Sequence, residues 1–163
     1  MAQAMTLLGA ITGTATTTTV SFVNIPQSFR DLRLVVTWVA GSVVGSDQIV
    51  QLNGDTTNTY LTVEMSGDGT TAASYSFTKT GLYLQYLSST ATNGQKSATF
   101  DLMDYSATDK HKTSLNRASN ANWSVDARAS RWPNTAAVTS LAVVSVSSTF
   151  AAGSTFYLYG IAG

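Results

Sequence analysis

Residues 32–39 read Leu-Arg-Leu-Val-Val-Thr-Trp-Val, and this stretch decides the fold class. Leu32, Leu34, Val36 and Trp38 occupy every second position, which is the side-chain period of a β-strand. The positions between them include two valines, so the second face of the strand is also partly apolar. We therefore expect this strand in the middle of a sheet, with Trp38 in the core and both faces covered.

Strand-length runs recur along the rest of the chain without helical spacers. They cover residues 20–22, 48–53, 75–77, 82–87, 96–105, 110–120, 123–132, 137–147 and 156–161. Turn signals separate many of them, at residues 25–27, 53–55, 66–69 and 151–154. Residues 59–65 fit either a strand or a helical turn, and 110–132 predicts an exposed, weakly apolar hairpin. Short strands at this spacing predict an all-β, antiparallel two-sheet sandwich.

The composition supports a β-protein whose surface carries hydroxyl groups more than charges. The chain has 25 Thr and 20 Ser, whereas charged residues make up 11% of it and Glu64 is the single glutamate. Nine basic residues balance nine acidic ones, so no net field would attract nucleic acid. Cysteine is absent, and no apolar run approaches the roughly 18–20 residues that span a membrane. Weak repulsion between copies favours a role in an assembly.

The N-terminal segment, residues 1–19, differs from the remainder, residues 20–163, which we expect to form one β-sandwich domain. The segment is rich in small residues and Thr, and its apolar residues are Met5, Leu7, Leu8 and Ile11. One interpretation is an ordinary first strand. The other is an extended arm that pairs with a sheet edge of a neighbouring subunit, where these four residues would contact the partner.

No residue set predicts catalysis or a cofactor. His111 is the single histidine, and it lies between two lysines that would hinder cation binding. Asp101 and Asp104 are three apart on an expected strand, so they would point to opposite faces and cannot form a glycosidase pair. Residues 66–70, Ser-Gly-Asp-Gly-Thr, lack the alternating ligands of a calcium loop and predict a turn. We therefore expect no enzyme, no metal and no cofactor.

Two tryptophans are candidates for contact with a partner. Trp123 and Trp132 lie among polar residues and near arginines, unlike Trp38. Tryptophan anchors protein interfaces and also lines carbohydrate sites. An outward position would suit contact with a partner subunit or a glycan, and the alternative is packing at the edge of the sandwich.

Several segments of the sequence form one further pattern. They are Phe-Asp-Leu-Met-Asp-Tyr-Ser at 100–106, Lys-His-Lys-Thr at 110–113, Ala-Val-Thr-Ser-Leu at 137–141, the closing run at 150–161, the early segments 25–27 and 32–34, and Trp132. Together they resemble a domain common in virion proteins of tailed bacteriophages. The resemblance extends from Val20 to Ile161. Its motifs are structural, so it brings no active-site residue.

The resemblance implies a jelly-roll-like sandwich on the surface of a phage particle, commonly as a homotrimer. Because the sequence starts at Met1 without a shaft or coiled coil, we expect a capsid decoration (cement) protein. Such a protein binds copies of itself and the major capsid protein and stabilises the shell. The alternative is a tail-fibre or receptor-binding module that contacts host glycans.

Overall fold

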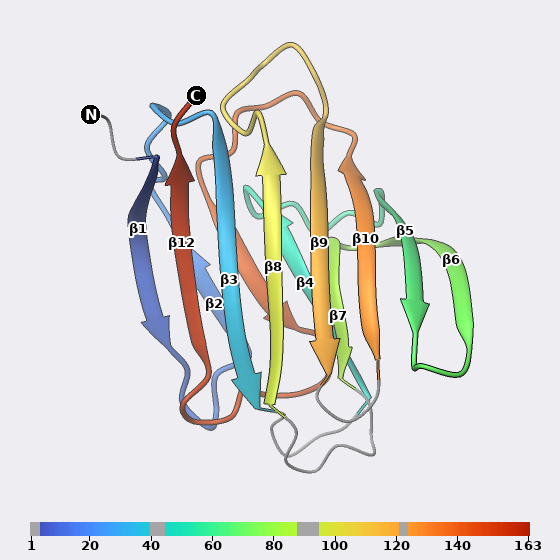
Figure 1. The fold of residues 1–163 in the computed structure, drawn as a ribbon. Helices are drawn as coiled ribbons and strands as arrows, with labels where there is room; N and C mark the ends of the chain where they lie inside the picture. Colours follow the sequence, from blue (N-terminus) through green and yellow to red (C-terminus); the bar gives the residue numbers. More distant parts are fainter. Residues whose placement is uncertain (1–3, 40–44, 88–94, 121–123) are drawn as a thin grey trace.

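The computed structural model describes residues 4–39, 45–87, 95–120 and 124–163, and twelve strands form in these residues. All pairings are antiparallel, which confirms the predicted all-β sandwich of two sheets (Figure 1). The strands are β1 (Met5–Thr12), β2 (Thr19–Phe22), β3 (Asp31–Val39), β4 (Ser46–Leu52), β5 (Tyr60–Gly67), β6 (Ala72–Lys79), β7 (Leu82–Leu87), β8 (Gln95–Met103), β9 (Lys112–Asn120), β10 (Val125–Trp132), β11 (Leu141–Ser145) and β12 (Thr155–Ile161).

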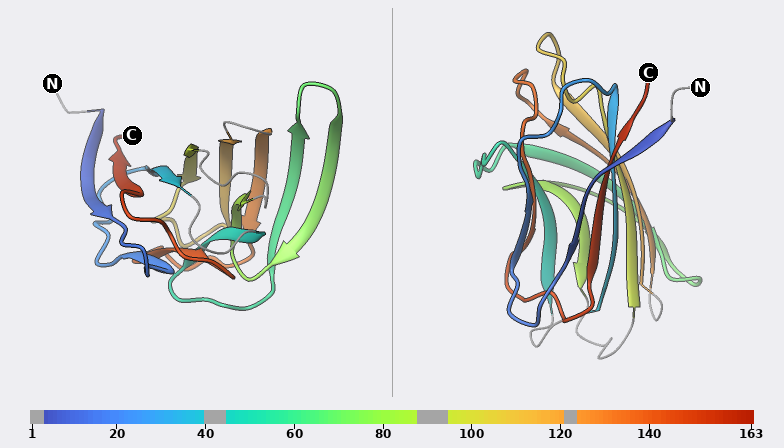
Figure 2. Two further views of the ribbon diagram at one scale, coloured as in Figure 1. Left: turned by 90° about the horizontal axis from the view of Figure 1, so that it is seen from below. Right: turned by 90° about the vertical axis from the view of Figure 1, so that its left-hand side faces the viewer.

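The two sheets differ in size. The large sheet has the order β1-β12-β3-β8-β9-β10-β5-β6, and the small sheet has the order β2-β11-β4-β7. The small sheet lies behind the large one in Figure 1, and the β5–β6 hairpin projects from the body at the end opposite β1 (Figure 2). The β5–β6 hairpin therefore overhangs one side of the sandwich.

The stretch that decides the fold becomes β3, between β12 and β8. Its inner side chains are buried as the alternation predicts, and Trp38 is in the core. The prediction that both faces are covered is wrong. The outer face is half-buried within its own sheet, because Arg33 pairs there with Asp101 of β8 and no second layer lies over it in the described chain.

The space between the sheets has an apolar half and a polar half. Under β12, β3 and β8, the core is built from aliphatic and aromatic side chains, including Phe100, Phe156 and Leu158. Under β9 and β10, most inner positions are polar instead, although Ala118 and Trp132 there belong to the apolar core. The buried polar residues there are Lys112, Ser114, Asn116, Asp126, Arg128 and Ser130. These two strands are therefore not the exposed hairpin that their sequence predicts.

Buried polar groups on β9 and β10 are possible because most of them have partners. Lys112 Nζ donates to three backbone carbonyls, those of Ala107, Lys110 and Thr135, over 2.6–3.1 Å. Burial lowers the pKa of this amine. Thr62 and Ser130 hydroxyls are 2.9 Å apart across β5 and β10. Such satisfied groups replace apolar packing in this half of the sandwich.

Other local predictions have mixed outcomes. Residues 59–65 are strand, since β5 covers nearly all of them, and Asn53 and Gly54 form the predicted turn with positive φ at both positions. The predicted strand 137–147 is shorter than expected, because only Leu141–Ser145 pairs with β2 and β4. No helix in the described residues is long and apolar enough to cross a membrane.

Candidate functional site

A cleft of about 300 Å³ lies beneath the overhanging β5–β6 hairpin. Its walls come from the inner faces of β5, β6 and β10 and from β7 of the small sheet. The lining includes four aromatic residues, Tyr75, Phe77, Tyr83 and Tyr86. We call it the tyrosine cleft. It is the place in the described chain where aromatic rings, an arginine and carboxylates come together in one hollow.

The floor of the tyrosine cleft is a buried charge network around Arg128 of β10. Arg128 Nε donates to Glu64 Oε2 over 2.7 Å, and its Nη2 lies 3.2 Å from Asp126 Oδ2. The arginine side chain is 1% exposed, against 11% for Glu64 and 6% for Asp126. Charges this deeply buried require partners, and the two carboxylates and the guanidinium provide them for one another.

Tyr83 forms the inner wall of the cleft. The Arg128 guanidinium carbon lies 4.8 Å from the Tyr83 ring centroid, and Lys79 Nζ lies 4.9 Å from it. Phe77 meets the same ring edge-on at 4.8 Å between centroids. Burial raises the pKa of Tyr83 most, and the negative charge of Asp47 raises it further, so the Tyr83 hydroxyl stays neutral. Cation–π contacts thus occupy this inner ring.

The rim of the cleft is open. Tyr75 of β6 is 52% exposed and Tyr86 of β7 is 40% exposed. At the tip of the β5–β6 hairpin, Asp68 accepts from the backbone amides of Thr70 and Thr71, and these bonds lower its pKa. This is the turn that residues 66–70 predict. The rim therefore presents two accessible rings beside a fixed carboxylate.

The large sheet holds β7 through side chains. Asn116 Nδ2 donates to the carbonyls of Tyr83 and Leu84 over 3.1 and 2.6 Å, and Arg128 Nη1 donates to the Leu84 carbonyl over 3.0 Å. The backbone of β7, an edge strand, is thereby partly capped by β9 and β10. The same arginine stabilises the cleft floor and the contact between the two sheets.

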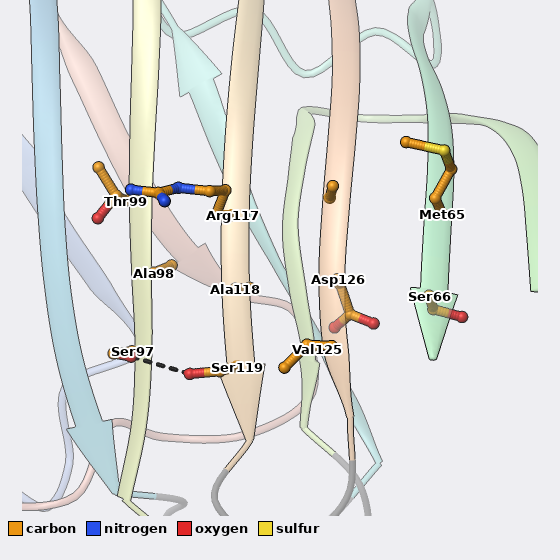
Figure 3. A pocket seen from close by; sticks show the side chains of 11 residues that line it. Met65, Ser66, Ser97, Ala98, Thr99, Arg117, Ala118, Ser119, Val125 and Asp126 are labelled. Atoms are coloured by element: carbon orange, nitrogen blue, oxygen red, sulfur yellow. Dashed lines mark hydrogen bonds between the residues drawn. The ribbon is translucent and has the colours of Figure 1, made fainter. Parts of the chain in front are cut away.

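The outer face of β5, β10 and β9 carries exposed apolar side chains, with Arg117 and Arg131 among them, whereas the inner face of these strands is mostly polar. Five large side chains there are between 40% and 66% exposed. We call them the outer apolar patch: Leu61, Val63, Met65, Leu115 and Val125. A hollow of about 550 Å³ lies at one end of it. Figure 3 shows its lining, with Met65 on β5, Val125 on β10 and Arg117 reaching from β9 toward Thr99. An apolar surface of this kind is a common interaction site.

Two edges of the large sheet are open. In the described residues, β1 bonds to β12 alone and β6 bonds to β5 alone, and the two lie at opposite ends of the sheet (Figure 1). Each is eight residues long, without proline, and Lys79 at the end of β6 is the one charge in either strand. Soluble sheets usually protect their edges with charge, proline or short length. The edge strand β2 is short, at four residues, whereas β1 has only its bulge between Leu7 and Gly9 and β6 has only Lys79 at its end.

The structure separates the residues predicted to contact a partner. Residues 5–12 form the first strand of the chain's own large sheet. Met5 and Leu7 are exposed there, but Leu8 and Ile11 pack against the core and are not free for a partner. A bulge between Leu7 and Gly9 separates the exposed residues, Met5 and Leu7, from those that pack against the core. Of the four arm residues, two therefore remain accessible.

The outward position considered for Trp132 is wrong. Trp132 is 1% exposed, its ring stacks on Tyr60 at 6.0 Å between centroids, and its Nε1 donates to Asp55 Oδ2 over 2.7 Å. The polar neighbours in its sequence are explained by the alternation of β10, which turns Arg131 outward. Trp123 lies outside the described residues.

The acidic residues considered for chemistry are dispersed. Asp101 is bound twice by Arg33 on the outer face, at 2.6 and 2.9 Å, whereas Asp104 lies in a turn with φ of 48° and contacts Lys110 at 3.4 Å. His111 is exposed. Within the described ranges, no three metal-ligating side chains cluster. These residues do not form a common site.

Sequence reasoning did not identify the tyrosine cleft. Its rings come from β6 and β7 and its charges from β5 and β10, which are far apart in the chain. The alternation of residues 60–65 points the wrong way, since it would bury Leu61, Val63 and Met65 and expose Glu64. In the structure Glu64 faces inward, and Arg128 is its buried partner.

Comparison with known proteins adds little. No protein-family model matches the chain, and no curated protein matches it. Among solved structures, a protein of unknown function from Shewanella oneidensis MR-1 aligns over 96% of this chain and 75% of its own length, with 9% identity and a TM-score of 0.23. A likeness at that level carries no argument about fold or function.

Proposed function

We propose that this protein is a non-enzymatic structural protein of a phage virion, which assembles on the capsid as a decoration (cement) protein. The phage setting is supported by the resemblance of residues 20–161 to virion domains. The assembly role is supported by one structural observation: the large sheet ends at both sides in long strands, β1 and β6, whose edges no described residue pairs with and which are almost uncharged.

The open edges suggest how copies join. An extended strand adds to a sheet edge through its free N–H and C=O groups, so β1 of one copy can pair with β6 of the next. Because β1 and β6 are different surfaces of the molecule, the contact is head-to-tail. Head-to-tail contacts close into a ring when the rotation between copies permits it, and a ring of three is the homotrimer that the resemblance implies.

The outer apolar patch is a second surface, and we assign it to the major capsid protein. The arm residues cannot serve as the whole lattice contact, since Leu8 and Ile11 face the chain's own core. The patch offers five exposed apolar side chains on one rigid sheet face. A protein that binds only the assembled shell stabilises that shell by mass action, without a chemical step.

The second candidate is a tail-fibre or receptor-binding module, and the tyrosine cleft favours it. A hollow with exposed rings and buried carboxylates suits a ligand better than it suits a lattice contact.

Copy number in purified particles separates the capsid and tail locations. Quantitative mass spectrometry against the major capsid protein should find hundreds of copies per particle if the protein decorates the capsid. A count of a few to a few dozen would contradict the decoration role and support the tail. Absence from the particle would contradict both.

A further inference from the structure

We propose that the tyrosine cleft is a saccharide-binding site, selective for neutral sugars over sugars that carry a carboxylate. This inference goes beyond assembly and holds for either location on a virion. It rests on the geometry of four aromatic residues and three buried charged residues under the β5–β6 hairpin.

The rim provides the apolar part of sugar recognition. Tyr75 and Tyr86 come from different sheets, border the same hollow and are exposed. A pyranose ring has apolar C–H faces, which pack on flat aromatic rings, while its hydroxyls point sideways. Tyrosine suits this contact because its ring is rigid and its hydroxyl also bonds to the ligand.

The floor provides the polar part. Arg128 engages one oxygen of each carboxylate, Glu64 Oε2 and Asp126 Oδ2. Ser124 Oγ also lies 3.5 Å from Asp126 Oδ2, whereas no side chain of the described residues bonds to the other oxygens, Glu64 Oε1 and Asp126 Oδ1. Carboxylate oxygens accept bonds from hydroxyl donors, and a sugar supplies several such donors at fixed spacing. The network is buried and held on strands, so these acceptors are already in place before a ligand arrives.

The charge of the floor sets the selectivity. One guanidinium faces two carboxylates, so Arg128, Glu64 and Asp126 together carry a formal charge of −1, and Asp68 at the hairpin tip adds another negative charge. Lys79, whose amine lies against the Tyr83 ring, is paired with Asp47 at 2.5 Å. A sialic or uronic acid would bring its own carboxylate into this negative field. Like charges placed together cost binding energy, whereas a neutral hydroxyl ligand avoids that cost.

A small cation is the competing ligand for an acidic, aromatic hollow. The inner ring is already used for cation contacts, since Arg128 and Lys79 both lie within 5 Å of the Tyr83 centroid. A further cation would find this ring already in contact with two cationic side chains. The arrangement therefore favours a neutral ligand.

The test is saturation-transfer NMR on the full chain, at millimolar ligand. The neutral probes are lactose, maltotriose and chitotriose. The acidic probes are 3′-sialyllactose, which is lactose with one sialic acid added, and trigalacturonate. Tetramethylammonium is the cation probe. We expect saturation transfer from the protein to at least one neutral probe. Wherever lactose binds, transfer to 3′-sialyllactose should be weaker than transfer to lactose.

Matched variants assign the binding to the cleft. Tyr75→Ala and Tyr86→Ala should each weaken binding of the neutral probe about tenfold. Tyr159→Ala, on β12 at the far side of the large sheet, should leave it unchanged. All three sites lie outside the core, and thermal unfolding checks that each variant is folded.

Three results would overturn the inference. They are no transfer to any neutral probe, stronger transfer to an acidic probe or to tetramethylammonium, and equal binding by the wild type and both cleft variants. None of these results depends on the oligomeric state, so failure here is distinguishable from failure of the assembly proposal.

Discussion

Replacement of Arg128 by methionine should destabilise the protein far more than any surface substitution. Methionine keeps much of the length of the side chain but removes the charge that Glu64 and Asp126 both contact at 2.7 and 3.2 Å. It also removes the Nη1 bond to the Leu84 carbonyl at 3.0 Å, so β7 loses part of its attachment to the large sheet.

The size of the effect follows from burial. Loss of one partner of a buried ion pair costs about 3–5 kcal/mol, because an uncompensated charge stays behind. A domain is stable by only about 5–15 kcal/mol, so this is a large fraction of the total. For a chain of this length each kcal/mol lowers Tm by about 2–4 °C, which gives a fall of roughly 6–20 °C.

The assay is urea unfolding at pH 7, read by circular dichroism. Arg131→Met is the matched control, since Arg131 lies on the same strand as Arg128 but points to the exposed face. It should change stability by less than about 0.5 kcal/mol. Adding Glu64→Gln and Asp126→Asn to Arg128→Met should recover part of the loss. If Arg128→Met stays within about 1 kcal/mol of the wild type, the buried network is not what stabilises this half of the sandwich.

Three further substitutions test other parts of the structure by thermal and urea unfolding. Gly160→Ala places a methyl group 2.4 Å from the Phe29 ring and should cost about 1–3 kcal/mol. Trp132→Phe keeps an aromatic ring against Tyr60 but is smaller and leaves Asp55 without the indole donor, so at least about 1–2 kcal/mol should be lost. Lys96→Met should stabilise by about 1–2 kcal/mol at pH 7, because burial lowers the pKa of Lys96 and its amine has no partner among the described residues.

The pH dependence of the Lys96 effect has a fixed sign. Since the pKa of Lys96 is lower in the folded chain, the unfolded chain binds more protons between that pKa and the ordinary value of about 10.4. The contribution of Lys96 to the free energy of unfolding of the wild type therefore becomes more favourable as pH rises through that window. The advantage of Lys96→Met should shrink over the same window, and an advantage that grows with pH would contradict the assignment.

The Gly160→Ala and Trp132→Phe predictions can each be contradicted by one result. Gly67→Ala meets nothing closer than 3.6 Å and should be nearly neutral, so an equal cost at both glycines would contradict the packing explanation for Gly160. A Trp132→Phe variant as stable as the wild type would show that the bond to Asp55 contributes nothing.

The sequence predicted the fold class well because alternation is a local property. In β3 and β12, large apolar side chains at every second position specify which face is buried, and both strands lie where the pattern predicts. Turn residues such as Asn53 and Gly54 also act locally, through their tolerance of positive φ.

The sequence misled where burial depends on partners from distant strands. In β10, Asp126 and Arg128 are polar and were expected at the surface, but Glu64 and β7 bury them. Conversely, Val125 is apolar and lies outside. Alternation shows that a strand has two different faces, but which face is buried depends on what covers it. Period alone therefore cannot reveal a strand whose polar face is buried and whose apolar face is exposed. Trp132 and the tyrosine cleft were missed for this same reason.

The most direct test of the account is the oligomeric state of the full chain with its sheet edges intact or blocked. Sedimentation velocity and native mass spectrometry should find a concentration-dependent trimer. Ser74→Lys with Ser76→Lys, which adds charge to the open edge strand β6, should convert it to monomer. Thr113→Lys, which adds a lysine to the interior strand β9, should leave the trimer intact. A wild-type chain that remains monomeric at every concentration, or a trimer that survives lysines on β6, would contradict assembly through the sheet edges.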